Sequence, residues 1–86
     1  MKDRTRIEII SQILKTANGG RDGAKKIRIM YGANLSHEQL KQYLMFLTQN
    51  NLLGYDLDTR TFKITEKGLR FLDTYDRIDP TIKAQI

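Results

Sequence analysis

Four basic side chains close together in the sequence give the clearest chemical signal in this chain: Arg21, Lys25, Lys26 and Arg28. Asp22 is the one acidic residue among them. Such a cluster is suited to contact the phosphates of a polyanion. Residues 1–41 carry the whole net charge of +5, whereas residues 42–86 are neutral. The charge distribution favours a nucleic-acid partner, with ordinary solubilising charge as an equal alternative when charge is taken alone.

The sequence offers little from which to build an enzyme site or a metal site. It has no cysteine, one histidine (His37) and no strongly placed pair of carboxylates. A thiolate nucleophile, a multi-histidine metal site and a general acid–base pair are therefore not expected. The glycines at positions 19, 20 and 23 lack the preceding strand and the Gly-Lys-Ser/Thr ending of a phosphate loop. We expect a protein that is not an enzyme and that uses no cofactor.

A helix is predicted to begin at His37 and to continue to residue 50. Ser36 and Gln39 form a capping-box pattern, in which each side chain accepts a hydrogen bond from the backbone amide of the other residue. An apolar stripe follows at helical spacing: Leu40, Leu44 and Leu47. Asn50 and Asn51 then supply residues that tolerate the left-handed conformation at a helix end.

The polar side of this helix is the candidate for contacting base pairs in the major groove of DNA. Gln42 is suited to pair with adenine, and Lys41 to meet a backbone oxygen. His37 and Gln39 can donate to base edges or phosphates, and Ser36 joins them at the N-terminal end of the helix. Because the helix carries one lysine and no arginine, we expect weak sequence discrimination.

Two extended segments follow this helix, Leu53–Leu57 and Thr61–Thr65. The β-branched and aromatic residues of the second segment favour a strand, and the tight turn between the segments favours a hairpin. We therefore predict a two-stranded wing over residues 53–65. Arg60 and Lys63 are expected to bring this wing to phosphates, each adding to the salt dependence of binding.

Two helices are predicted before residue 37. The first runs from Asp3 or Arg4 to Asn18, where Gly19-Gly20 ends it, and the second from Gly23 or Ala24 to Tyr31. The second helix and the helix at residue 37 are separated by the short turn of a helix-turn-helix. We expect its apolar residues to face inward: Ala24, Ile27 and Met30. We also expect five aromatic side chains to be in the core, because a domain this small needs them inside: Tyr31, Tyr43, Phe46, Tyr55 and Phe62.

A further helix is predicted after the wing, capped by Thr65 and ending near Ile78. Leu69 and Leu72 are expected to face the core. A second stripe has the spacing of a coiled-coil seam and predicts dimerisation through this helix, with a frayed monomeric tail as the alternative: Phe71, Tyr75, Ile78 and Ile82. Asp79-Pro80 interrupts the helix, so residues 79–86 are expected to form a tail or a final turn.

The order of these elements predicts a mainly α fold of the α+β type. It is a winged helix-turn-helix domain over residues 1–78, made of three helices, a two-stranded hairpin and a C-terminal helix. The charged N-terminus, with no long apolar run, predicts neither a signal peptide nor a membrane span, and we expect a cytoplasmic protein.

The chain resembles the archaeal winged helix-turn-helix proteins grouped as ArnR-like, which include small chromatin proteins with a C-terminal dimerisation helix. The matching segments span about Arg6 to Ile78, and the most specific of them is TEKGLRFL. The others are KIRIMY at residues 26–31, Leu35-Ser36, Gln39-Leu40, Tyr43-Leu44, and Leu52-Leu53 with Tyr55. The resemblance implies a nucleoid-associated homodimer that binds double-stranded DNA. This chain stops soon after Pro80, so we expect a shorter dimer contact than a long coiled coil.

Two functions remain after this reasoning. The first is a double-stranded DNA-binding protein, either a transcriptional regulator or a weakly selective chromatin protein, with helix 37–50 in the major groove and hairpin 53–65 as its wing. The second is an adaptor that uses the winged helix as a scaffold for protein interactions, since folds of this kind serve both purposes.

Overall fold

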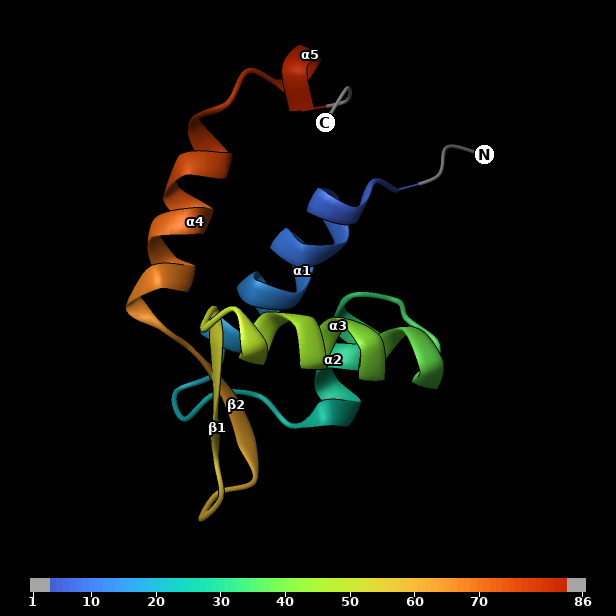
Figure 1. Ribbon diagram of the computed structural model, residues 1–86, viewed down its shortest axis with the longest axis vertical. Helices are drawn as coiled ribbons and strands as arrows, with labels where there is room; N and C mark the ends of the chain where they lie inside the picture. Colours follow the sequence, from blue (N-terminus) through green and yellow to red (C-terminus); the bar gives the residue numbers. More distant parts are fainter. Residues whose placement is uncertain (1–3, 84–86) are drawn as a thin grey trace.

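The computed structural model describes residues 4–83 and contains a helical body with one hairpin projecting from it (Figure 1). Its elements follow the predicted order, and the winged helix-turn-helix fold is confirmed. They are α1 (Arg6–Asn18), α2 (Lys26–Gly32), α3 (His37–Gln49), β1 (Leu53–Asp56), β2 (Thr61–Ile64), α4 (Glu66–Arg77) and α5 (Pro80–Lys83). Helix α1 begins at Arg6, two residues after the predicted start at Arg4, and a start at Asp3 lies outside the described residues.

Helix α1 begins at a capping box that the sequence analysis did not identify. Thr5 accepts a hydrogen bond from the Glu8 amide, and the Glu8 carboxylate accepts one from the Thr5 amide. Just before the helix, the Arg4 guanidinium donates to the backbone carbonyls of Ala33 and Asn34. Arg4 therefore ties the start of α1 to the turn between α2 and α3, and satisfies carbonyls that the end of α2 leaves free.

Helix α3 has the ends that the sequence predicts. The Ser36 hydroxyl accepts from the Gln39 amide at 3.2 Å, and the Gln39 side chain accepts from the Ser36 amide at 3.1 Å. At the other end Asn51 has a φ of 60°, in the left-handed region, so the predicted helix stop is confirmed. Leu40, Leu44 and Leu47 are all buried.

The hairpin is antiparallel, with Leu53 opposite Ile64 and Asp56 opposite Thr61. Its strands are each one residue shorter than predicted. Ala24 adds a single β-bridge to Phe62, with paired backbone hydrogen bonds of 2.9 and 2.8 Å. Gly23 permits this approach, because its φ of 90° is unfavourable for other residues and a Cβ there would lie 2.5 Å from the Phe62 carbonyl oxygen. The bridge joins the loop before α2 to the wing.

One apolar core connects these elements. Its largest fully buried side chains come from three helices and a strand: Ile13, Leu14, Ile29, Leu47 and Leu53. Helix α1 contacts α2, α4 and β2, whereas α3 contacts α2 and β1. The wing therefore rests on the same core that orients α3.

The prediction for the two faces of α4 was wrong in part. Leu72 is buried as predicted, but Leu69 is 44% exposed, and Tyr75, predicted to lie in an exposed seam, is only 7% exposed. The reason is Gly68, where a Cβ would come within 2.5 Å of the Leu52 carbonyl oxygen. This close approach turns Gly68, Leu72 and Tyr75 inward, at i, i+4 and i+7. A glycine adds nothing to apolar periodicity, so the sequence pattern did not reveal this face.

The remainder of the predicted seam is therefore not continuous. Phe71 stacks on Tyr75 with ring centroids 6.3 Å apart and packs against the core, and Ile78 is half-buried. Ile82 is exposed, but it belongs to the separate short helix α5. Helix α4 ends at Arg77, as the interruption at Asp79-Pro80 predicts.

Two other predictions about the core were wrong in part. Helix α2 begins at Lys26, later than expected, and Ala24 lies before it in the bridge to the wing. Ala24 is buried and Met30 packs against the core, as predicted, but Ile27 is exposed and Ile29 is fully buried instead. Among the aromatic residues, Phe62 is buried and Tyr43 is partly buried. Three others predicted in the core are exposed: Tyr31, Phe46 and Tyr55. Leucine and isoleucine fill the core instead.

Candidate nucleic-acid interface

An open groove lies between α2, α3 and the wing, with a volume of about 540 Å³. In Figure 1 the wing projects below α3, and α2 lies on the same side. The side chains that line the groove come from these three elements: Lys26, His37, Leu40, Lys41, Leu44, Met45, Thr48 and Phe62. The groove therefore has an apolar floor and carries two lysines and a histidine.

The structure brings together three of the residues that the sequence singled out, Lys26, His37 and Lys41. His37 and Lys41 are one helical turn apart on α3, and Lys26 is the first residue of α2. Within residues 4–83 neither lysine forms an ion pair. Their charges are available to an external anion.

The other candidates on or next to α3 either line a different hollow or cap the helix. Gln42 lines a separate hollow with Arg6, Tyr43 and Phe46, where the Arg6 guanidinium lies 5.5 Å from the centre of the Phe46 ring. Ser36 and Gln39 are exposed, and their side chains form the capping box of the helix. Gln42 and Gln39 are therefore not part of the groove.

The remaining basic candidates surround the groove without lining it. Lys25 and Arg28 are exposed on or next to α2, and neither forms an ion pair with a described residue. Arg21 shares a hollow with Lys63, on the side of β2 next to the end of α1. Arg60 is exposed at the wing tip with a φ of 56°.

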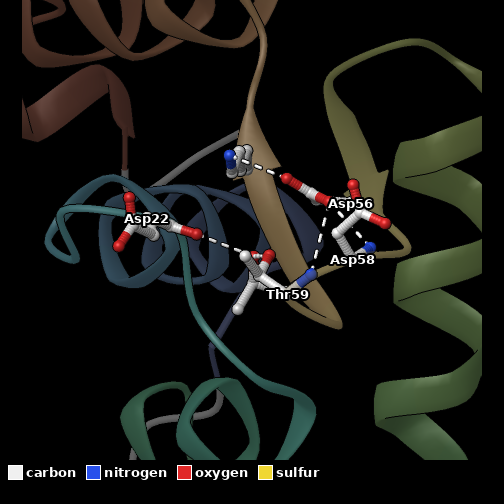
Figure 2. Close-up of polar contacts among 6 residues, drawn as sticks. Asp22, Asp56, Asp58 and Thr59 are labelled. Carbon is white, nitrogen blue, oxygen red and sulfur yellow. Dashed lines mark hydrogen bonds and ion pairs between the residues drawn. The ribbon is translucent and has the colours of Figure 1, made fainter.

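The wing is held by a network around Asp56 (Figure 2). One carboxylate oxygen pairs with the Lys63 ammonium at 3.0 Å, and the other accepts from the Asp58 amide at 2.9 Å. The hydrogen bond from Lys63 lowers the pKa of Asp56, as do the amides of Thr59 and Asp58. The same contact with Asp56 raises the pKa of Lys63. Lys63 is therefore a partly neutralised cation, unlike the two lysines of the groove.

A second chain of hydrogen bonds ties the wing tip to the body. The hydroxyls of Thr59 and Thr61 lie 2.7 Å apart, and the Thr61 hydroxyl donates to the Asp22 carbonyl at 2.7 Å (Figure 2). Together with the bridge between Ala24 and Phe62, these contacts fix the wing relative to α2. The groove consequently has a defined width before any ligand binds.

Met45 is an exposed groove residue that the sequence analysis did not select for DNA contact. It is 53% exposed and follows Lys41 by one helical turn. The spacing of positions 37, 41 and 45 contained this signal, since residues four apart share a helix face. Candidate residues were chosen for their polarity alone, so this methionine was not selected.

Other types of site receive no support from the described part of the chain. Within residues 4–83, no three His, Asp or Glu side chains gather as a metal site requires. No helix in that range is both long enough and apolar enough to cross a membrane.

Comparison with known proteins agrees with the geometry. A family model described as winged helix-turn-helix matches residues 3–83, which is nearly the whole chain. A search of curated proteins gave no match. The wing, the helix-turn-helix pair and their connection through one core are the features that this match covers. The chain belongs to the winged helix-turn-helix family.

Proposed function

We propose that this protein binds double-stranded DNA, with α3 entering the major groove and the hairpin acting as the wing. The observation that carries the proposal is the groove between α2, α3 and the wing, where Lys26 and Lys41 have no ion-pair partner among the described residues. Membership of the winged helix-turn-helix family supports the same function. Lys25 and Arg28 add further cations beside the groove.

A salt titration tests the proposal directly. We expect the wild-type protein to bind a random-sequence duplex with a log affinity that falls linearly with log salt, by about 0.9 for each phosphate neutralised. Fluorescence anisotropy of a labelled duplex measures both the affinity and this slope. Absence of binding to duplex DNA at low salt would contradict the proposal.

Loss of the ion pair on the wing is expected to strengthen DNA binding rather than weaken it. Asp56→Asn preserves an oxygen that accepts from the turn amides but removes the charge that holds Lys63. If Lys63 then contacts one phosphate, affinity rises up to about eightfold at about 0.1 M salt and the salt slope steepens by about 0.9. Asp58→Asn is the matched control, because it removes a neighbouring charge that has no ion pair with Lys63. Equal effects of the two variants would exclude a specific role for the ion pair.

The pH dependence of this ion pair follows from the two shifts. Asp56 has a lowered pKa, so the contribution of the pair to stability is present above the ordinary carboxyl range and is lost as pH falls through the lowered value. Lys63 has a raised pKa, so the contribution is lost on the alkaline side only as pH rises through that raised value. Around neutral pH the ion pair is intact, so the effect of Asp56→Asn on DNA affinity does not change with pH in that range.

We also propose that the protein belongs to the narrower ArnR-like group of archaeal winged helix-turn-helix proteins, which includes small chromatin proteins. The few base-reading side chains in the groove favour a weakly selective chromatin protein over a regulator with one strict operator. An adaptor function has less support, because burial of Tyr75 divides the apolar stripe on which that alternative depends.

We also propose that the protein forms a homodimer through the outer face of α4. The charges on this face alternate along the helix, and two ion pairs within it join them, Glu66 with Arg70 at 3.4 Å and Asp73 with Arg77 at 3.1 Å. A dimer would exchange these pairs for pairs between the two copies. In an antiparallel pair of α4 helices, Glu66 faces Arg77 of the second copy and Arg70 faces Asp73. The face is thus complementary to itself, as a two-fold contact requires. Exposed ion pairs contribute about 0–1 kcal/mol each, so this dimer is weak and sensitive to salt.

Charge reversal on α4 tests the dimer. Arg70→Glu with Arg77→Glu makes the face negative, and Glu66→Arg with Asp73→Arg makes it positive. We expect each double variant to sediment as a monomer at low salt and a mixture of the two to form a heterodimer. A monomeric wild type, or a double variant that still self-associates, would refute this contact.

A further inference from the structure

Met45 occupies a distinctive place in the groove. It lies on the same flank of α3 as His37 and Lys41, and it exposes 53% of its surface although the groove floor beside it is apolar. Leu40, Leu44 and Phe62 form that floor and are buried. The Met45 side chain is therefore the apolar group that α3 presents to whatever enters the groove.

Among the described residues, the one side-chain hydroxyl that lines the groove is engaged with its own helix. The Thr48 hydroxyl donates back to the helix, 2.8 Å from the Leu44 carbonyl oxygen and 3.1 Å from that of Met45. Gln42 lines the separate hollow with Arg6. Beyond Lys41 toward the C-terminal end of α3, the lining of the groove consequently has no free side-chain donor to contact a base edge.

We infer that Met45 determines sequence preference by contacting the C5-methyl group of thymine. The inference rests on the proposed DNA binding and specifies what the groove recognises. Among the groups that base pairs present in the major groove, the thymine methyl is the apolar one, whereas the others donate or accept hydrogen bonds. The unbranched, polarisable thioether of methionine adapts well to such a methyl group. The lysines around the groove hold the phosphates, and the thioether distinguishes thymine from cytosine.

Duplexes that differ by this methyl group alone provide the test. One pair of labelled duplexes is rich in A·T base pairs, with thymine in one and uracil in the other. A second pair is rich in G·C base pairs, with cytosine in one and 5-methylcytosine in the other. We expect wild type to bind the methylated member of each pair more tightly, by about fourfold for each methyl group contacted.

Variants of Met45 assign the preference to its side chain. Met45→Ala should bind both members of each pair equally and keep the wild-type salt slope, since the lysines are unchanged. Met45→Leu should retain a preference for the methylated duplexes. Leu69→Ala is the matched control, being a substitution of an exposed apolar residue on α4 outside the groove, and should behave as wild type.

The outcomes separate this inference from the proposed function. Equal binding of wild type to both members of each pair would overturn the role of Met45 and leave DNA binding in place. A methyl preference that survives in Met45→Ala would do the same, because it would come from the shape of the duplex. Absence of binding to all four duplexes would overturn the proposed function and this inference together.

Discussion

Replacement of both Lys26 and Lys41 by glutamine should weaken binding to a random-sequence duplex about 60-fold at about 0.1 M salt. These two lysines line the groove without ion-pair partners in residues 4–83, so each is free to neutralise one phosphate. Loss of two such contacts lowers the salt slope by about 1.8, and the difference from wild type should nearly vanish as salt approaches about 1 M. Anisotropy titrations over a series of salt concentrations measure both quantities.

A control variant with the same change in net charge distinguishes direct phosphate contacts of the groove lysines from long-range electrostatic attraction to DNA. Lys15→Gln with Lys83→Gln removes two positive charges from α1 and α5, away from the groove and from the proposed dimer contact. This control should lose little affinity and should keep the wild-type slope. If it weakens binding as much as the groove variant does, net charge is responsible and the groove is not the interface. Circular dichroism of both variants establishes that the fold is retained.

Leu47→Ala is expected to destabilise the protein by about 2–5 kcal/mol. Leu47 on α3 has no exposed surface, and its loss removes buried methyl groups and leaves a cavity in the single core. A chain of this length has a total stability of roughly 4–13 kcal/mol, so the variant loses a large part of it. Urea unfolding followed by circular dichroism gives the free energy of unfolding and shows whether the slope with denaturant is unchanged.

Leu57→Ala provides the comparison at the wing tip. Leu57 is 78% exposed, and its replacement should change the free energy of unfolding by no more than about 0.5 kcal/mol. A similar loss in both variants would contradict the burial difference on which the prediction depends.

Local features of the fold were predictable from the sequence because they depend on neighbouring residues. The α3 capping box, the end of that helix at Asn51, and the stop of α4 before Pro80 all arise from side chains a few positions apart. The stripe of Leu40, Leu44 and Leu47 is buried as its spacing predicts. These local features predicted the order of the elements, and that order predicted the winged helix-turn-helix fold.

The faces of short helices were less predictable, since a helix turns by about 100° for each residue. Ala24 lies before the start of α2 and is buried through its bridge to Phe62, so its position did not indicate the buried face of the helix. In that helix Ile29 is buried and Ile27 is exposed. On α4 the close approach of Gly68 to the Leu52 carbonyl selects the inward face, and Tyr75 is buried as a result. In both helices the deciding contact involves a residue distant in sequence.

The candidate site, like the fold, could be predicted from the sequence only in part. By itself the sequence determined the elements, their caps, the positive charge of the first half and the presence of Lys26, His37 and Lys41 on two adjacent helices. Only the tertiary structure decided that these three residues share one groove with Met45, that Gln42 belongs to another hollow and that Lys63 is held by Asp56. The physical reason is range: caps and helical spacing act within a few residues. The groove depends on how α2, α3 and the wing pack on one core, which no local pattern encodes.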